Sequence, residues 1–124
     1  MQRQFVGGKI HRATVTDAQI DYEGSISIDA DLLRAVDIRP HEKVLIANLT
    51  NGARLESYAI ESPAGSGEVC LNGGAAKHGK KGDLVIIMSF VILNADEIED
   101  YHPKVVRVNE ENKIVPMPSA SLAS

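Results

Sequence analysis

The sequence contains one cysteine, Cys70, and no tryptophan among its 124 residues. A single thiol excludes a disulfide within the chain and a metal site built from cysteines alone, and it is typical of a reducing compartment. Aromatic residues are also scarce, with two Phe and three Tyr. The hydrophobic core therefore has to be built mainly from Val, Ile, Leu and Ala.

The chain also lacks a long apolar run and an excess of positive charge. Its longest apolar run, residues 84–93, is too short for a membrane-spanning helix, which needs roughly 20 residues. The N-terminus has no apolar stretch of signal-peptide length. Thirteen basic and seventeen acidic residues give a net charge of −4, whereas proteins that coat nucleic acid are usually basic. We therefore expect a cytoplasmic protein that binds neither membrane nor nucleic acid.

Signals for β-strands outnumber those for helices. Hydrophobic residues make up 44% and charged residues 24% of the chain, as in ordinary globular proteins. An Asn-Gly pair at Asn51 and Gly52 predicts a hairpin between two apolar runs. The pattern predicts six or seven short strands, among them residues 9–16, 25–28, 43–49, 54–60, 68–71 and, as a buried strand, 84–93. We expect one small β-barrel domain over residues 1–115 and a flexible tail over 116–124.

The helical signals are few and short. Asp29 is a candidate N-cap for a helix of about two turns over residues 29–36, with Pro40 beyond its end. Residues 74–78 predict a single turn, and residues 94–101 predict another that Asn94 caps. The predicted fold class is therefore mainly β with a few short helices.

Two familiar site patterns are absent or incomplete. Residues 74–81 imitate a phosphate-binding loop, but Lys81 stands where the pattern needs a hydroxyl for Mg²⁺. We interpret this basic segment as a solvated surface turn, since no aromatic lies nearby to stack on a base. No histidine is spaced as a metal ligand with another histidine or with Cys70, so we expect no metal. Cys70 itself lies in an apolar predicted strand and is interpreted as a buried small hydrophobe.

The pair Gly24-Ser25 has more specific chemistry, although a Gly-Ser pair is usually only a turn. Glycine adopts strained backbone angles at no steric cost. A serine hydroxyl directly after it can attack the glycine carbonyl if a donor stabilises the oxyanion. The resulting ester can undergo β-elimination to a dehydroalanine, which hydrolyses to a pyruvoyl group and ammonia. A chain can thus make a carbonyl cofactor from its own serine.

The order and spacing of several motifs resemble those of the bacterial aspartate 1-decarboxylases. The likeness covers residues 3–112, and no single short motif carries it. The motifs are Gly8-Lys9-Ile10-His11-Arg12, Thr16, Tyr22-Glu23-Gly24-Ser25, Asp29, Thr50-Asn51-Gly52, Arg54, Tyr58-Ala59-Ile60, Asn72-Gly73, Ala75-Ala76, Gly82-Asp83 and Ser89-Phe90. The resemblance implies a double-psi β-barrel and a homotetramer with active sites between subunits.

The resemblance also implies an activity. An inactive precursor would cleave itself between Gly24 and Ser25 into a β-chain, 1–24, and an α-chain, 25–124. The new N-terminus would be a covalent pyruvoyl group derived from Ser25. Through a Schiff base with this group, L-aspartate would lose CO₂, and Tyr58 would donate the proton that gives β-alanine. The product would serve pantothenate and coenzyme A synthesis.

Further site residues follow from the same resemblance. Arg54 and Lys9 match cationic positions of the substrate pocket, and His11 and Tyr22 match positions with a supporting role in processing. The matched substrate-binding positions are Asn72, Ser57, Gly73, Gly74 and Ala75. The chain departs from the family at Ser57, where Thr is usual, and at Gly74, where Ala is common.

Two other functions remain open from the residues alone. A fold does not determine a function, so the same barrel could be a binding module that never matures. A small DNA-binding barrel is a second alternative, but the acidic net charge and the lack of a basic stripe disfavour it. Because Ser25, Tyr58, Arg54 and Lys9 are all present, we favour the enzyme.

Overall fold

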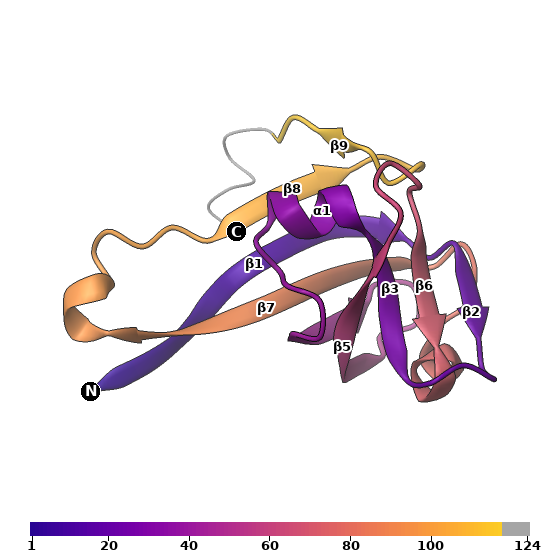
Figure 1. The fold of residues 1–124 in the computed structure, drawn as a ribbon, viewed down its shortest axis with the longest axis horizontal. Coiled ribbons are helices and arrows are strands. Elements are labelled where there is room, and N and C mark those ends of the chain that lie inside the picture. Colours follow the sequence, from indigo (N-terminus) through magenta and orange to yellow (C-terminus); the bar gives the residue numbers. More distant parts are fainter. Residues whose placement is uncertain (118–124) are drawn as a thin grey trace.

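The computed structural model describes residues 1–117 and is mainly β, as predicted (Figure 1). The strands are β1 (Gln2–Thr14), β2 (Asp17–Gln19), β3 (Ser25–Asp29), β4 (Lys43–Asn48), β5 (Arg54–Ser62), β6 (Val69–Asn72), β7 (Leu84–Asn94), β8 (Lys104–Val108) and β9 (Ile114–Val115). They form one nine-stranded sheet in the order β2-β6-β3-β5-β4-β7-β1-β8-β9. The pairing is mixed, and a barrel-like sheet fits it. The predicted tail lies mostly outside the described residues.

The three helices are short: α1 (Ala30–Ala35), the 3₁₀ helix η1 (Gly73–His78) and the 3₁₀ turn η2 (Ala95–Glu97). The Asp29 side chain accepts a hydrogen bond from the Asp31 backbone nitrogen at 2.8 Å. Asn94 and Glu97 form a capping box at η2. Both predicted caps are therefore confirmed. A cap involves only residues close in sequence, so it can be predicted without knowledge of the tertiary fold. None of these helices in residues 1–117 is long and apolar enough to cross a membrane.

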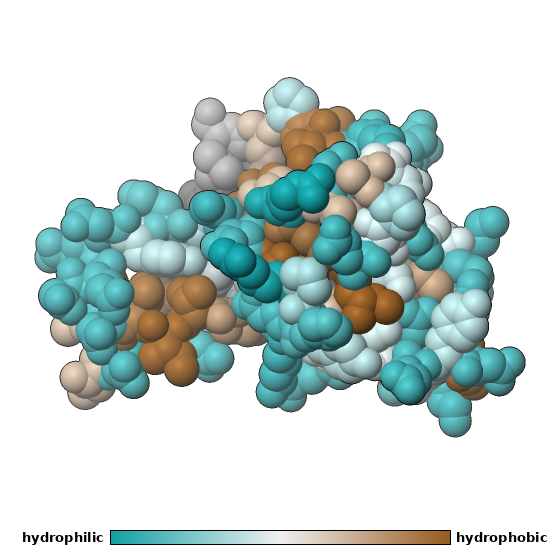
Figure 2. Space-filling view, viewed as in Figure 1, coloured by the Kyte–Doolittle hydropathy of each residue, from teal (hydrophilic) through white to brown (hydrophobic). Residues whose placement is uncertain are grey.

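Strand β1 is longer than predicted, because it starts at Gln2 and not at residue 9, whereas β7 extends only one residue beyond the predicted strand. β1 has 13 residues and β7 has 11, and their antiparallel pair extends beyond the rest of the sheet as an arm (Figure 1). The prediction that residues 84–93 form a buried strand is wrong at Phe90 and Ile92, in the distal half of β7, which are exposed, although Leu93 beside them is buried. Figure 2 shows apolar side chains gathered over this arm. Strands β2, β8 and β9 were not predicted.

The short strand β3 lies at the centre of the packed region. It pairs in parallel with β5 and antiparallel with β6, and all five of its residues are buried. The fully buried aliphatic side chains around it include Ile10, Ile26, Ile28, Ile46, Leu71, Val85 and Ile87. Strand β3 is therefore held in place by backbone hydrogen bonds along both of its edges.

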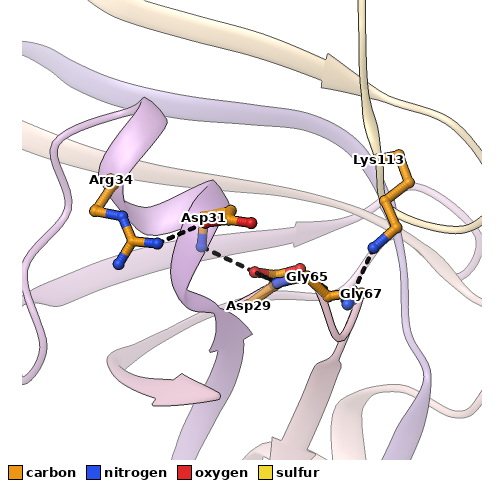
Figure 3. A network of polar contacts seen from close by, with 6 residues as sticks. All are labelled: Asp29, Asp31, Arg34, Gly65, Gly67 and Lys113. Carbon is orange, nitrogen blue, oxygen red and sulfur yellow. Dashed lines mark hydrogen bonds and ion pairs between the residues drawn. The ribbon is translucent and has the colours of Figure 1, made fainter. Parts of the chain in front are cut away.

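Asp29 anchors the C-terminal end of β3 (Figure 3). Besides the N–H of Asp31, its carboxylate accepts hydrogen bonds from Gly65 at 3.0 Å and Gly67 at 2.8 Å. Lys113 binds the Gly65 carbonyl through its ammonium group. Burial acts to raise the pKa of Asp29, but the backbone donors outweigh burial and hold this pKa below its ordinary value. This network connects β3, α1 and the loop between β5 and β6.

Candidate active site

The predicted cleavage pair lies where an exposed loop enters a buried strand. Gly24 is exposed, whereas Ser25, the first residue of β3, is only 2% exposed. The Asn72 side-chain nitrogen donates a hydrogen bond to the Ser25 hydroxyl oxygen at 3.0 Å. The Ser25 hydroxyl in turn faces the Glu23 carbonyl oxygen at 3.4 Å. The Ser25 hydroxyl is thus oriented by Asn72 on β6 and by the Glu23 carbonyl two residues before it.

Gly73 packs directly against this cleavage pair. A Cβ atom at Gly73 would lie 2.6 Å from the Gly24 nitrogen and 2.5 Å from the Tyr22 carbonyl oxygen. The φ angle of Gly73 is +58°, a region that favours glycine. An added Cβ at Gly24 would be 3.9 Å from the Gly74 nitrogen. The start of η1 and the loop before β3 are therefore in close backbone contact.

A pocket of about 420 Å³ opens next to Gly24. The residues that line it are Gly24, Leu55, Glu56, Ser57, Tyr58, Gly74, Ala75 and His78. Strand β5 and helix η1 thus bring three of the predicted substrate-site residues, Ser57, Gly74 and Ala75, and the predicted proton donor Tyr58 to the cleavage pair. The Tyr58 ring stacks on the His41 ring with a centroid distance of 6.4 Å. Tyr58 is half-buried and lines the pocket.

Arg54 and Tyr22 lie at the margin of this site. Arg54 is exposed at the start of β5 and does not line the pocket. The Tyr22 side chain is 62% exposed. The backbone carbonyl oxygen of Tyr22, in contrast, packs against Gly73. Neither side chain has a described contact with Ser25.

Lys9 and His11 do not line this pocket. They lie on β1, which pairs with β7 and β8, and β1 is the fourth strand along the sheet from β3. Burial lowers the pKa of His11, and the positive charges of Lys9, Arg12 and Arg107 act in the same direction. His11 is therefore favoured as the neutral imidazole. The described chain therefore does not bring these two residues to the pocket that Tyr58 and Gly24 line.

Sequence reasoning missed three residues around the site. His78 was interpreted only as part of a basic loop; it is exposed, as predicted, but it also lines the pocket. Ser27 and Cys70 contact the Asn72 side chain. Only the pairing of β3 with β6 brings these residues together, and strand order could not be read from the sequence. Cys70 is buried as predicted, and no group of three metal-binding side chains occurs in residues 1–117.

Two kinds of sequence comparison relate this chain to known proteins. The sequence model described as aspartate decarboxylase matches residues 1–115. The aspartate 1-decarboxylase of Neisseria meningitidis is 57% identical over 92% of this chain and 90% of its own length. That of Thermoanaerobacter pseudethanolicus is 50% identical over 94% of this chain and 100% of its own length. With matches of this extent, the chain belongs to the aspartate decarboxylase family.

Proposed function

We propose that this protein is a carboxy-lyase that converts L-aspartate to β-alanine and CO₂ with a pyruvoyl group made from its own Ser25. Family membership and the names of its relatives support the reaction. The observation that carries the proposal is the Ser25 hydroxyl, held by Asn72 at 3.0 Å beside the pocket that Ser57 and Tyr58 line. We also place the product in pantothenate and coenzyme A synthesis.

Maturation begins with an acyl shift at the cleavage pair. The Ser25 oxygen attacks the Gly24 carbonyl carbon, the peptide C–N bond breaks, and the nitrogen takes the hydroxyl proton. Loss of the Ser25 Cα proton then breaks the Cβ–Oγ bond, and Gly24 leaves as a carboxylate. Water hydrolyses the remaining enamine through its imine, which releases ammonia and leaves a ketone. The products are chains 1–24 and 25–124.

The surroundings of Ser25 fit such a carbonyl group. The residue is buried, and the Asn72 nitrogen that now donates to the hydroxyl is also a suitable donor for a carbonyl oxygen. Asn72 and the backbone of Gly73 and Gly74 would hold the group. Once formed, the pyruvoyl group supplies an electron-withdrawing carbonyl that binds the substrate amine covalently.

The remaining pocket residues bind substrate and transfer a proton. Tyr58 holds a proton at its hydroxyl and delivers it to the substrate carbon that has lost CO₂. Ser57 supplies a hydroxyl for the oxyanion at Gly24 or for the substrate. A guanidinium clamped on the departing carboxylate would stabilise the ground state and slow the loss of CO₂. We therefore assign Arg54 to the side-chain carboxylate, which the product retains.

A homotetramer would complete the site. Lys9 and His11 are separated from Ser25 along the sheet of one subunit, so a neighbouring subunit is the suitable source of these side chains. Phe90 is 37% and Ile92 is 64% exposed on the arm. An apolar surface of this kind favours association between subunits.

Intact mass and product release together test the proposal. The wild-type chain should separate into fragments 1–24 and 25–124 and should release β-alanine from L-aspartate. Ser25→Ala should stay one chain and release none. An uncleaved wild-type chain without β-alanine release would contradict the enzyme and would favour a binding module on the same fold.

A further inference from the structure

Four side chains form a closed cluster on one face of the β3–β6 pair. Ser25 lies opposite Asn72, and Ser27 lies opposite Cys70, in the antiparallel register. Residues two apart in a strand point to the same face, so all four side chains share it. Their exposed fractions are 2% for Ser25, Asn72 and Cys70 and 9% for Ser27. Solvent therefore contributes little to the orientation of the Asn72 side chain.

Every polar atom of the Asn72 carboxamide has a partner in this cluster. Its nitrogen donates one hydrogen bond to Ser25 Oγ at 3.0 Å and another to Ser27 Oγ at 2.9 Å. Its oxygen accepts a hydrogen bond from the Cys70 thiol at 3.3 Å. The two N–H groups and the carbonyl of the amide are all used, which defines one orientation of the group.

Rotating this amide by 180° would place its carbonyl oxygen, an acceptor, where the NH₂ group now donates to the two serine oxygens. The NH₂ group would then face the Cys70 sulfur, a weak acceptor, and a buried N–H would be left without a good partner. Burial raises the pKa of Cys70, and the negative charges of Asp17 and Glu68 add to the effect. The thiol therefore keeps its proton and remains a donor toward the Asn72 oxygen.

The orientation matters because the charge on the Ser25 oxygen changes during maturation. This oxygen begins as a hydroxyl, becomes an ester oxygen and leaves as part of the Gly24 carboxylate. An N–H donor stabilises the developing negative charge, whereas an amide oxygen would oppose it. A misoriented Asn72 would consequently slow the elimination step even with Asn72 itself present.

We propose that Ser27 and Cys70 are positioning residues for self-cleavage, which act by holding the NH₂ group of Asn72 toward the Ser25 oxygen. This inference rests on the proposed function, since it concerns the cleavage between Gly24 and Ser25. Neither residue touches the reacting atoms in the structure. Each acts through the Asn72 side chain alone.

The test follows the loss of intact precursor by mass spectrometry at constant temperature. Ser27→Ala and Cys70→Ala should each slow cleavage about tenfold, the order of effect of one lost hydrogen bond. Ser27→Thr keeps a hydroxyl that accepts from the Asn72 nitrogen, and Cys70→Ser keeps a group that donates to the Asn72 oxygen. Both variants should therefore cleave at a rate near that of the wild type. Ile26→Val, a buried change on the opposite face of β3, should leave the cleavage rate unchanged.

A double-variant cycle separates positioning from a general effect on the fold. In an Asn72→Ala background, Ser27→Ala should not change the cleavage rate further, because the Asn72 side chain through which Ser27 acts on Ser25 is no longer present. Thermal unfolding of each precursor shows whether a slow variant is folded. Equal cleavage rates in the wild type and the alanine variants would overturn this inference but not the proposed function. The same holds if Ser27→Thr and Cys70→Ser cleave as slowly as the alanine variants. A wild-type chain that never cleaves would overturn both the inference and the proposed function.

Discussion

Gly73 and Gly24 pack backbone against backbone, so that a Cβ atom on Gly73 would lie 2.6 Å from the Gly24 nitrogen. We expect Gly73→Ala to displace the cleavage pair and to slow self-cleavage by at least tenfold. The strained φ angle should also lower the free energy of unfolding by about 1–3 kcal/mol. Gly74→Ala is the matched control for stability, since nothing lies within 4 Å of its added Cβ. Similar unfolding curves for the two variants would contradict this account.

Arg54→Lys should raise the KM for L-aspartate by about tenfold or more and leave kcat within about twofold of the wild type. Lysine retains the positive charge but lacks the planar pair of donors that binds a carboxylate at two points. Steady-state kinetics measure both constants. Arg39→Lys, a change at an exposed position that does not line the pocket, is the control. An unchanged KM in Arg54→Lys would remove Arg54 from substrate binding.

Ser57→Thr should accelerate self-cleavage by about threefold, the size expected when one side-chain rotation is restricted. Ser57 is half-buried beside Gly24 and lines the same pocket. Its hydroxyl is retained in Thr, while the added methyl group limits its rotamers. The precursor half-life measures the effect, and equal half-lives would show that rotamer freedom at this position does not limit cleavage.

Asp29→Asn should lower the free energy of unfolding by about 2 kcal/mol near neutral pH, because three backbone N–H groups bind the carboxylate. Those donors lower the pKa of Asp29 in the folded state from the ordinary value of 3.8. A carboxyl group whose pKa is lowered by folding stabilises the fold to the full extent at pH values above its ordinary pKa. This contribution is lost as the pH falls through the folded-state pKa.

Urea unfolding of the Asp29→Asn precursor and the wild-type precursor at pH 7, 5 and 3 checks both statements. The difference between the two proteins should be constant from pH 7 to pH 5 and smaller at pH 3. A difference that grows as the pH falls would show that the carboxyl group is protonated in the native state.

Ile92→Lys should convert the proposed tetramer to a smaller species by placing a charge on the apolar surface of the arm. Light scattering would then report a mass below that of four chains of 13.4 kDa each. Ile114→Lys changes a comparably exposed residue on β9, away from the arm, and should leave the mass unchanged. Loss of assembly should also reduce activity if a second subunit supplies Lys9.

The sequence predicts local features of this molecule well. The cap at Asp29, the turn at Asn51-Gly52 and the hairpin strands on either side of it all depend on neighbouring residues, and the structure has each of them. The extent of the arm was not predictable in the same way. Phe90 and Ile92 continue an apolar run that is typical of a buried strand, yet their side chains are exposed.

The candidate site was only partly predictable. The resemblance indicated Ser25, Tyr58 and Asn72, and the structure brings these residues close to one pocket or to one another. Ser27 and Cys70 carry no motif, and their role depends on the β3–β6 register, which no local pattern determines. The position of Lys9 on β1, four strands along the sheet from β3, likewise depends on strand order, which no local pattern determines.

The pairing of β1 with both β7 and β8 has a consequence for refolding. Cleavage after Gly24 would cut the chain without removing β1 from the sheet, because β1 lies in fragment 1–24 and its partners lie in fragment 25–124. The uncleaved precursor subunit can recover its sheet in a unimolecular process, before any assembly. The mature protein, once denatured, would have to recover its sheet by a bimolecular encounter, so its recovery would depend on concentration.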